Sequence, residues 1–289
     1  MKRNADRIIF TIIAYVSFII LLGIITLIAI EGIPLLKTYS LKELVFGKEW
    51  RPTQTPPLFG FLPSIVSTFY IAVFSMLFAV PISLGSAIYL SKLASPQVRS
   101  FLKPTIELLA SIPSVIYGSF AMLFLSPIIK NIFHLPTGLT GLNASIILAI
   151  MSIPTIITLA DDAISLTPKE EELASFGLGA SKYQTIMKVT IPSALPGIFA
   201  AITLGFGRAI GETMAVLMAS GNSIRIPSSI LEPMRPITAS IALEMAETPV
   251  GSLHYRALFM LGFVLLIFVL LFNMLSRYLR KIYIKRLYG

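Results

Sequence analysis

The chain of 289 residues contains no cysteine and little charge. Without cysteine it can form neither a disulfide framework nor a thiolate metal site. Charged residues make up 13% of the chain, whereas an ordinary soluble domain has about 25%. This shortage is what a lipid-facing surface requires, because a charge at mid-bilayer costs at least roughly 3 kcal/mol. The composition therefore favours an integral membrane protein.

The sequence also lacks the patterns of two common catalytic sites. It contains no GxxxxGK[ST] loop and no HExxH pattern, so neither a nucleotide-phosphate cradle nor a zinc-protease site is predicted. Its two histidines, His134 and His254, fall near membrane boundaries and are expected at the surface rather than on a metal. Trp50, the only tryptophan, is expected either to anchor a membrane interface or to pack within its loop.

Long uncharged runs fill much of the chain. Residues 8–30, 61–91 and 257–276 hold no charge, and each can supply the roughly 20 helical residues that cross a hydrocarbon core. The first run is expected to be an uncleaved anchor, since no small-residue cleavage site follows it. We predict an all-α membrane protein of one domain (1–289) with six spans: about 8–30, 62–91, 104–129, 139–160, 197–220 and 257–277.

The segments between these spans differ in charge. With the N-terminus inside, the inner segments hold 14 lysines and arginines and the outer segments eight. The excess of positive charge predicts that both termini are cytoplasmic. The outer loops are then 31–60, which is rich in proline, and 221–256, in which a short helix is expected over 237–247.

The inner loop, residues 161–196, carries helix signals. Thr167 before Pro168 predicts the start of a short helix, and Gly177 and Gly179 are expected to break or bend it. Ser181 is a cap for a second helix, which the prolines at 192 and 196 are expected to end. Two short helices with a glycine elbow would let another protein approach closely. The alternative is a plain surface loop.

A charged pair lies within the fifth predicted span. Arg208 and Glu212 are four residues apart, which places them on one face of a continuous helix. Ionisable groups at this depth usually face a cavity or a partner, so the pair is either a self-satisfied ion pair or an anion site with Arg208 as the attracting charge. Glu107, in the third predicted span, is expected to pair with Arg208 or to stay protonated.

Two glycines near the charged pair suggest a helix contact. Gly207 and Gly211 are four residues apart, and small residues at that spacing let helices pack closely in lipid. The contact is expected either within the chain or with a partner subunit.

The inner loop resembles a known family. Its pattern resembles the EAA loop of the permease subunits of ABC importers, which forms a coupling helix in a groove of the ATPase subunit. In that family a Glu stands six residues before the Gly, where this chain has Leu173, and Glu172 comes one position earlier. The coupling residues that the resemblance implies are Glu172, Ala174, Gly177, Gly179, Ala180, Ser181, Ile191 and Pro192.

Other stretches narrow the resemblance to phosphate importers. The segment GRAIGETMAV at 207–216 is similar to the PstC branch of their permeases, as are FGKEWRP at 46–52, FGFLPSIVST at 59–68 and ELLASIPSVIYG at 107–118. The resemblance implies a type I ABC-importer arrangement in a prokaryotic cell membrane, with Arg208 and Glu212 associated with phosphate movement. The implied partners are a PstA-like permease subunit, two PstB-like ATPases that bind ATP and Mg, and an extracytoplasmic PstS-like binding protein.

The physics of phosphate import agrees with an ATPase partner. Moving one charge against 100 mV costs about 2.3 kcal/mol, and phosphate carries one to two negative charges. Two alternatives remain open at the level of sequence. One is the same machine for another oxyanion, such as molybdate, sulfate or a phosphonate. The other is a secondary anion transporter acting alone, although no internal repeat with broken helices supports it.

Overall fold

The computed structural model describes residues 2–288, and side chains for residues 9–282. The side chains of Lys2, Arg3, Arg7, Lys285 and Arg286, which contribute to the predicted charge bias, lie outside the described residues. Six of the described helices are long and apolar enough to cross a membrane, which confirms the predicted number of spans. They are Ile9–Lys37, Leu62–Leu93, Ser114–Ile132, Gly141–Ser165, Lys182–Gly211 and Leu253–Ile282.

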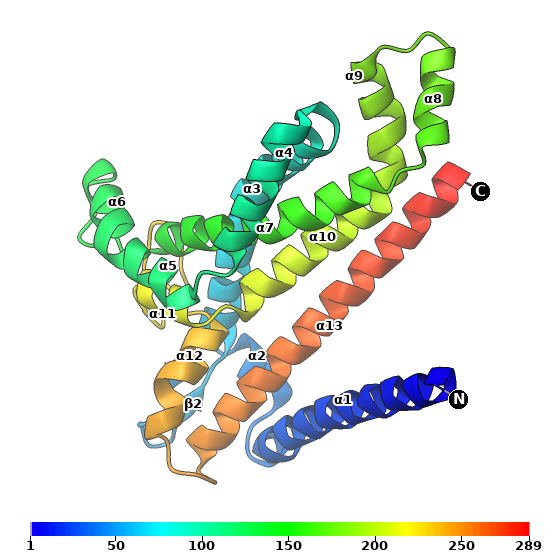
Figure 1. Cartoon of the computed structure of the whole chain (residues 1–289). Coiled ribbons are helices and arrows are strands. Elements are labelled where there is room, and N and C mark those ends of the chain that lie inside the picture. The colour runs from blue at the N-terminus through cyan, green and yellow to red at the C-terminus, as the bar shows by residue number, and fades with distance from the viewer. Residues whose placement is uncertain (1, 289) are drawn as a thin grey trace. The chain divides into compact units, whose positions relative to one another are not determined.

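The chain divides into two compact units, which are described separately. One comprises Met1–Leu62 and Ser240–Phe268, and the other Pro63–Ala239 and Val269–Gly289. Figure 1 shows that helices dominate both. In order, the elements are α1 (Lys2–Gly32), a 3₁₀ turn (Ile33–Lys37), α2 (Leu41–Phe46), β1 (Trp50–Arg51), β2 (Leu58–Phe59), α3 (Leu62–Ile88), a π-helical turn (Tyr89–Leu93), α4 (Pro96–Ala110), α5 (Ser114–Phe120), a second π-helical turn (Ala121–Leu125), α6 (Ser126–Ile132), α7 (Gly141–Ser165), α8 (Lys169–Gly177), α9 (Lys182–Thr185), a third π-helical turn (Ile186–Thr190), α10 (Ile191–Gly211), α11 (Met214–Ala219), α12 (Ile237–Glu244), a 3₁₀ turn (Met245–Glu247) and α13 (Leu253–Tyr288).

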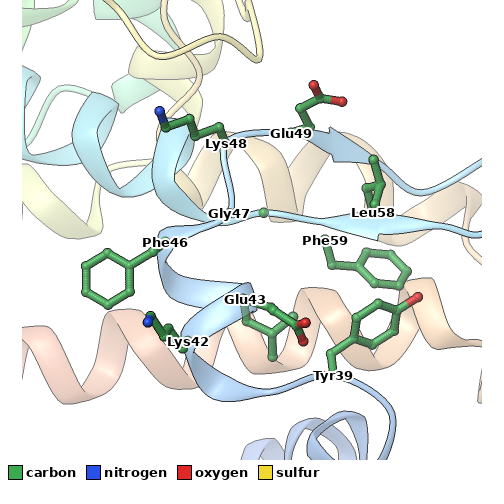
Figure 2. A pocket seen from close by; sticks show the side chains of 11 residues that line it. Tyr39, Lys42, Glu43, Phe46, Gly47, Lys48, Glu49, Leu58 and Phe59 are labelled. Carbon is green, nitrogen blue, oxygen red and sulfur yellow. The ribbon is translucent and has the colours of Figure 1, made fainter.

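In the first unit, the 31–60 loop folds on itself. Strands β1 and β2 pair antiparallel with Trp50 opposite Phe59. Glycine is required where Gly47 and Gly60 meet, because a Cβ on Gly60 would lie 2.5 Å from the Gly47 carbonyl. Figure 2 shows the largely apolar pocket of about 530 Å³ that this loop forms, with Tyr39 and Phe59 side by side at one end.

Trp50 takes the packing role rather than that of an interface anchor. Its ring is buried and meets Phe59 edge-on at 5.7 Å between ring centroids. Its Nε1 donates to both carboxylate oxygens of Glu244, at 2.9 and 3.1 Å. The predicted surface role of His254 is wrong, because His254 is partly buried and its Nε2 lies 2.7 Å from Glu244. His134 is exposed, as expected.

In the second unit, α7 forms the centre and packs against α4, α10 and α11. Glycine permits the close approach of α10, since a Cβ on Gly205 would lie 2.6 Å from Cγ1 of Ile156 on α7. Figure 1 shows α7 and α10 running alongside each other, with the α8–α9 hairpin standing beyond their adjoining ends.

Two predicted spans have different bounds from those expected. The third was expected from residue 104, but α4 ends at Ala110 and a new helix begins at Ser114, after Pro113 at its N-cap. The fifth was expected over 197–220, but one continuous helix runs over Lys182–Gly211 and ends there. Apolar residues lie on both sides of each break. Hydropathy alone therefore predicted one span where the backbone forms two helices, α4 and α5 in the first case and α10 and α11 in the second.

The segment that contains Ile230 and Glu232 is held by backbone bonds to the start of α7. The amide of Gly141 donates to the carbonyl of Glu232 at 2.9 Å, and that of Leu142 to Ile230 at 2.7 Å. The helix expected over 237–247 appears as α12 followed by the 3₁₀ turn.

Candidate functional site

Arg208 lies in the last turn of α10 and is partly buried. Its Nη1 donates to Oγ1 of Thr155 on α7 at 3.1 Å. Among the residues that the structure describes, no carboxylate forms an ion pair with it. A guanidinium has five N–H donors, so the contact with neutral Thr155 orients the group and leaves its charge and most of its donors available.

Glu212 does not share a helix face with Arg208, so that prediction is wrong. α10 ends at Gly211, and Glu212 has an extended backbone with ψ of 134°. Its Oε1 accepts from the amide of Ala215 at 3.2 Å, at the start of α11. Its carbonyl accepts from Oγ1 of Thr238 at 2.8 Å. Glu212 thus fixes the break between two helices, and the ion pair considered as an alternative is not formed.

Glu107 is also displaced from its expected position. It is exposed on α4, which precedes the third spanning helix instead of belonging to it. With Arg99 and Lys103 it lines one shallow surface of α4. The prediction of a buried group that pairs with Arg208 is therefore wrong.

Gly207 and Gly211 make no close helix contact within the described chain. A Cβ on either would meet nothing within 4 Å. The close contacts of α10 with α7 occur instead at Gly197 and Gly205. A contact of Gly207 and Gly211 with a partner subunit stays a prediction.

The loop between α7 and α10 contains the two expected short helices. Ser181 caps α9 as predicted, with Oγ accepting from the Gln184 amide at 3.3 Å and the Gln184 side chain accepting from Ser181 in return at 2.8 Å. Thr167 does not cap α8. Pro168 occupies the N-cap, and the buried Oγ1 of Thr167 has no partner among the described residues.

The elbow between α8 and α9 depends on Gly179. Its φ of +82° is in the left-handed region, which glycine enters without steric cost. The amide of Ala180 bonds to Ser175 O at 3.1 Å and that of Gly179 to Phe176 O at 2.9 Å, which is the Schellman pattern. Gly177 lies within α8.

The expected helix end at the Ile191-Pro192 step is not found. A π-helical turn over Ile186–Thr190 continues directly into α10, and such local adjustments let prolines stand within a spanning helix. α9 and the spanning helix therefore form one rod, with Pro192 and Pro196 inside it.

Glu172 points back toward the spans. Its Oε1 accepts from Nζ of Lys92, at the end of α3, at 2.5 Å and from Oγ1 of Thr190 at 2.9 Å. Burial alone would raise the pKa of Glu172, but the hydrogen bonds from Lys92 and Thr190 and the charges of Lys92 and Lys169 outweigh it, and the pKa is lowered. Sequence reasoning missed Lys92, Thr155 and Thr190, because their partners are 18 to 80 residues away.

Several large apolar side chains of the loop are exposed. Leu173 is 66% exposed, Leu178 90% and Tyr183 72%. Leu173 stands where the resemblance expected a glutamate. Large exposed apolar side chains are typical of protein-binding surfaces.

Six spanning helices, an arginine inside one of them without an ion-pair partner among the described residues, and a two-helix loop with exposed apolar side chains are typical of a helical membrane permease. The chain belongs to the family of binding-protein-dependent transport system inner membrane components, which residues 79–287 match. This confirms the resemblance to importer permeases.

Known relatives support the assignment. The chain is 38% identical over 82% of its length to the probable ABC transporter permease protein YqgH of Bacillus subtilis, covering 77% of that protein. It is 32% identical over 91% of its length to the phosphate transport system permease protein PstC of Haemophilus influenzae, covering 88% of that protein. Its fold is similar to a chain in a bacterial alginate ABC transporter bound to its periplasmic protein, with a TM-score of 0.65, 16% identity and 96% coverage of both chains.

Proposed function

We propose that this chain is one permease subunit of an ATP-driven phosphate importer and lines half of the translocation pathway. The observation that carries the proposal is Arg208, a partly buried cation whose side-chain partner is the neutral Thr155. The phosphate relatives point to the same substrate.

Arg208 is suited to a passing oxyanion. Its planar fork matches the oxygens of phosphate, and charge-assisted bonds of this kind are strong in a partly desolvated site. A single arginine gives attraction without a closed cage of donors. We expect weak intrinsic affinity for phosphate, with selectivity set mainly by the binding protein, and a tight site on the purified permease would contradict this role.

The partners follow from the energy that import requires. This chain has no nucleotide loop, so ATP and Mg bind to two ATPase subunits, and the chain itself is not an enzyme. The α8–α9 loop, with Leu173, Leu178 and Tyr183 exposed, is the ATPase docking segment. A second permease subunit completes the pathway, and an extracytoplasmic binding protein delivers phosphate. The α8–α9 loop and both termini then face the cytoplasm.

The continuous helix over Lys182–Gly211 joins the α8–α9 loop directly to the segment that carries Arg208. α9, the π-helical turn and α10 join without a break, and α10 carries Arg208. When the ATPases close, the displaced loop moves one end of this rod, and the spans rock from inward-open to outward-open. Release of phosphate follows ATP hydrolysis.

An importer for another oxyanion is the alternative, because an arginine alone accepts sulfate or molybdate as well. The test is uptake by the reconstituted importer in vesicles with ATP, comparing the native chain with Arg208→Gln. Losing a charged hydrogen-bond partner costs about 1.5–3 kcal/mol, so uptake should fall about 10- to 100-fold. Arg225→Gln, an exposed arginine outside the spans, is the control and should transport normally.

Assembly with the ATPase is checked by co-purification. Unchanged uptake in an assembled Arg208→Gln importer would make Arg208 a structural residue. Uptake of sulfate or molybdate in preference to phosphate by the native complex would replace the substrate.

A further inference from the structure

The inner end of α3 is connected to the loop that the ATPase would move. Lys92 lies in the π-helical turn that ends this span, and its Nζ is 2.5 Å from Glu172 on α8. Both side chains are about four-fifths buried, with 16% and 20% exposed. The contact is therefore a shielded ion pair between two segments 80 residues apart, and not one of the mobile pairs of a solvated surface.

The Glu172 carboxylate joins three segments. Oε1 accepts from Lys92 on the α3 side and from Thr190 in the turn that leads into α10. The neighbouring Glu171 accepts from Ser193 on α10 at 2.6 Å. Bonds to Thr190 and Ser193 hold α8 to the rod that it directly precedes, whereas the bond to Lys92 holds it to a different spanning helix.

The end of α3 is in turn tied to α4 and α7. The Oγ atoms of Ser91 and Ser165 lie 3.1 Å apart. Arg99 on α4 donates to Leu90 O at 3.2 Å and to Asp161 on α7 at 3.0 Å. At this end the turn after α3 is therefore bonded to α4, α7 and α8.

We propose that Lys92 and Glu172 form a positioning pair that makes α3 follow the loop when the ATPases close. The loop follows α7 directly in the chain and continues into α10, whereas Lys92 connects it to α3 through a side chain, so without the pair α3 would not follow the other two helices. The lowered pKa of Glu172 agrees with an ionised pair at neutral pH. The proposal rests on the proposed function, because it assumes an ATPase that moves the loop.

The first test measures phosphate uptake and ATP hydrolysis together in vesicles that contain the complete importer. In Lys92→Met the number of phosphates carried per ATP should fall at least about fivefold, the low end of ordinary coupling between sites, while ATP hydrolysis continues. The exchanged pair Lys92→Glu with Glu172→Lys should restore the ratio, since Thr190 can accept from an ammonium as well as donate to a carboxylate. Lys188→Met, an exposed lysine of the same loop, is the control and should behave as native.

The second test measures the distance between the end of the α3 span and α8, and it needs no phosphate. Because the chain has no cysteine, spin labels can be placed at Leu93→Cys and Glu170→Cys, both exposed. In the assembled importer the label distance should stay constant between nucleotide-free and ATP-bound states, and should change between them in Lys92→Met.

The outcomes separate the two proposals. A native importer that carries no phosphate contradicts the proposed function, while a constant label distance that Lys92→Met abolishes still supports the pair. An unchanged transport ratio in an assembled Lys92→Met importer overturns the pair. So does an exchanged pair as impaired as Lys92→Met, or a label distance that is equally constant in Lys92→Met.

Discussion

Asp161 and Asp162 test how much burial strengthens the ion pairs near the C-terminal end of α7. The two residues are adjacent, yet the Asp161 side chain is 1% exposed and that of Asp162 53%. Asp161 accepts from Arg99 at 3.0 Å and Lys103 at 3.1 Å, whereas Asp162 accepts from Lys103 alone, at 2.8 Å. Asp161→Asn and Asp162→Asn make the same chemical change, a carboxylate to an amide. The first makes it at a buried position and the second at a solvated one.

The magnitude follows from what each change leaves unpaired. Breaking a buried pair costs about 3–5 kcal/mol, but Arg99 and Lys103 remain 33% and 30% exposed and can recover some hydration. We expect Asp161→Asn to lower the free energy of unfolding by about 2 kcal/mol. Asp162→Asn breaks a solvated pair, which is worth about 0–1 kcal/mol.

Thermal unfolding of the purified permease in nanodiscs measures the difference. With about 2–4 °C per kcal/mol for a chain of this order of size, Asp161→Asn should unfold roughly 4–8 °C lower than native, and Asp162→Asn within a few degrees of it. If Asp162→Asn proved as destabilising as Asp161→Asn, burial of the Asp161 ion pairs would not be the source of their stability.

Two further expectations concern a backbone position and a titration. Gly221 and Gly251 both have φ of +80°, but a Cβ on Gly221 would also meet Leu139 O and lie 2.8 Å from Cβ of Pro233, whereas one on Gly251 meets nothing within 4 Å. Gly251→Ala should cost only the strain of about 1–2 kcal/mol, and Gly221→Ala at least about 1 kcal/mol more; equal unfolding temperatures would contradict the clash. The pKa of Glu172 is lowered from 4.5, so its contribution to stability is complete above that pH and is lost as the pH falls through the lower native pKa. Unfolding temperatures measured from pH 7 to pH 3 should thus converge for native and Glu172→Gln, and a gap that stays constant over this range would argue against the ionised pair.

Much of the fold could be predicted from local sequence alone. The number of spans depends on uncharged length, and the α9 cap depends on Ser181 and Gln184, which are three residues apart. The elbow at Gly179 needs a positive φ, which is also a local requirement. Each of these features depends on residues that are close together in the chain, so it can be recognised from a single sequence.

The errors have a common physical origin in long-range contacts. The GRAIGET stretch is compatible with a continuing helix, and the break at Glu212 is held from outside by Thr238, 26 residues away. The Lys92–Glu172 pair joins residues with no local signal of their proximity. Glu107 is different, because Arg99, Lys103 and Glu107 recur every four residues along α4, and that periodicity could have indicated a polar helix face instead of a span.

The break after α10 also bears on the proposed role of Arg208 in anion passage. A glutamate one helical turn beyond Arg208 would neutralise it if the helix continued, and the site would then attract little negative charge. The extended backbone at Glu212 directs that carboxylate to the start of α11, where the Ala215 amide binds it. Thr155 supplies orientation without charge. Under the proposed function, the Arg208–Thr155 contact keeps a cation within the spanning helix available to an oxyanion.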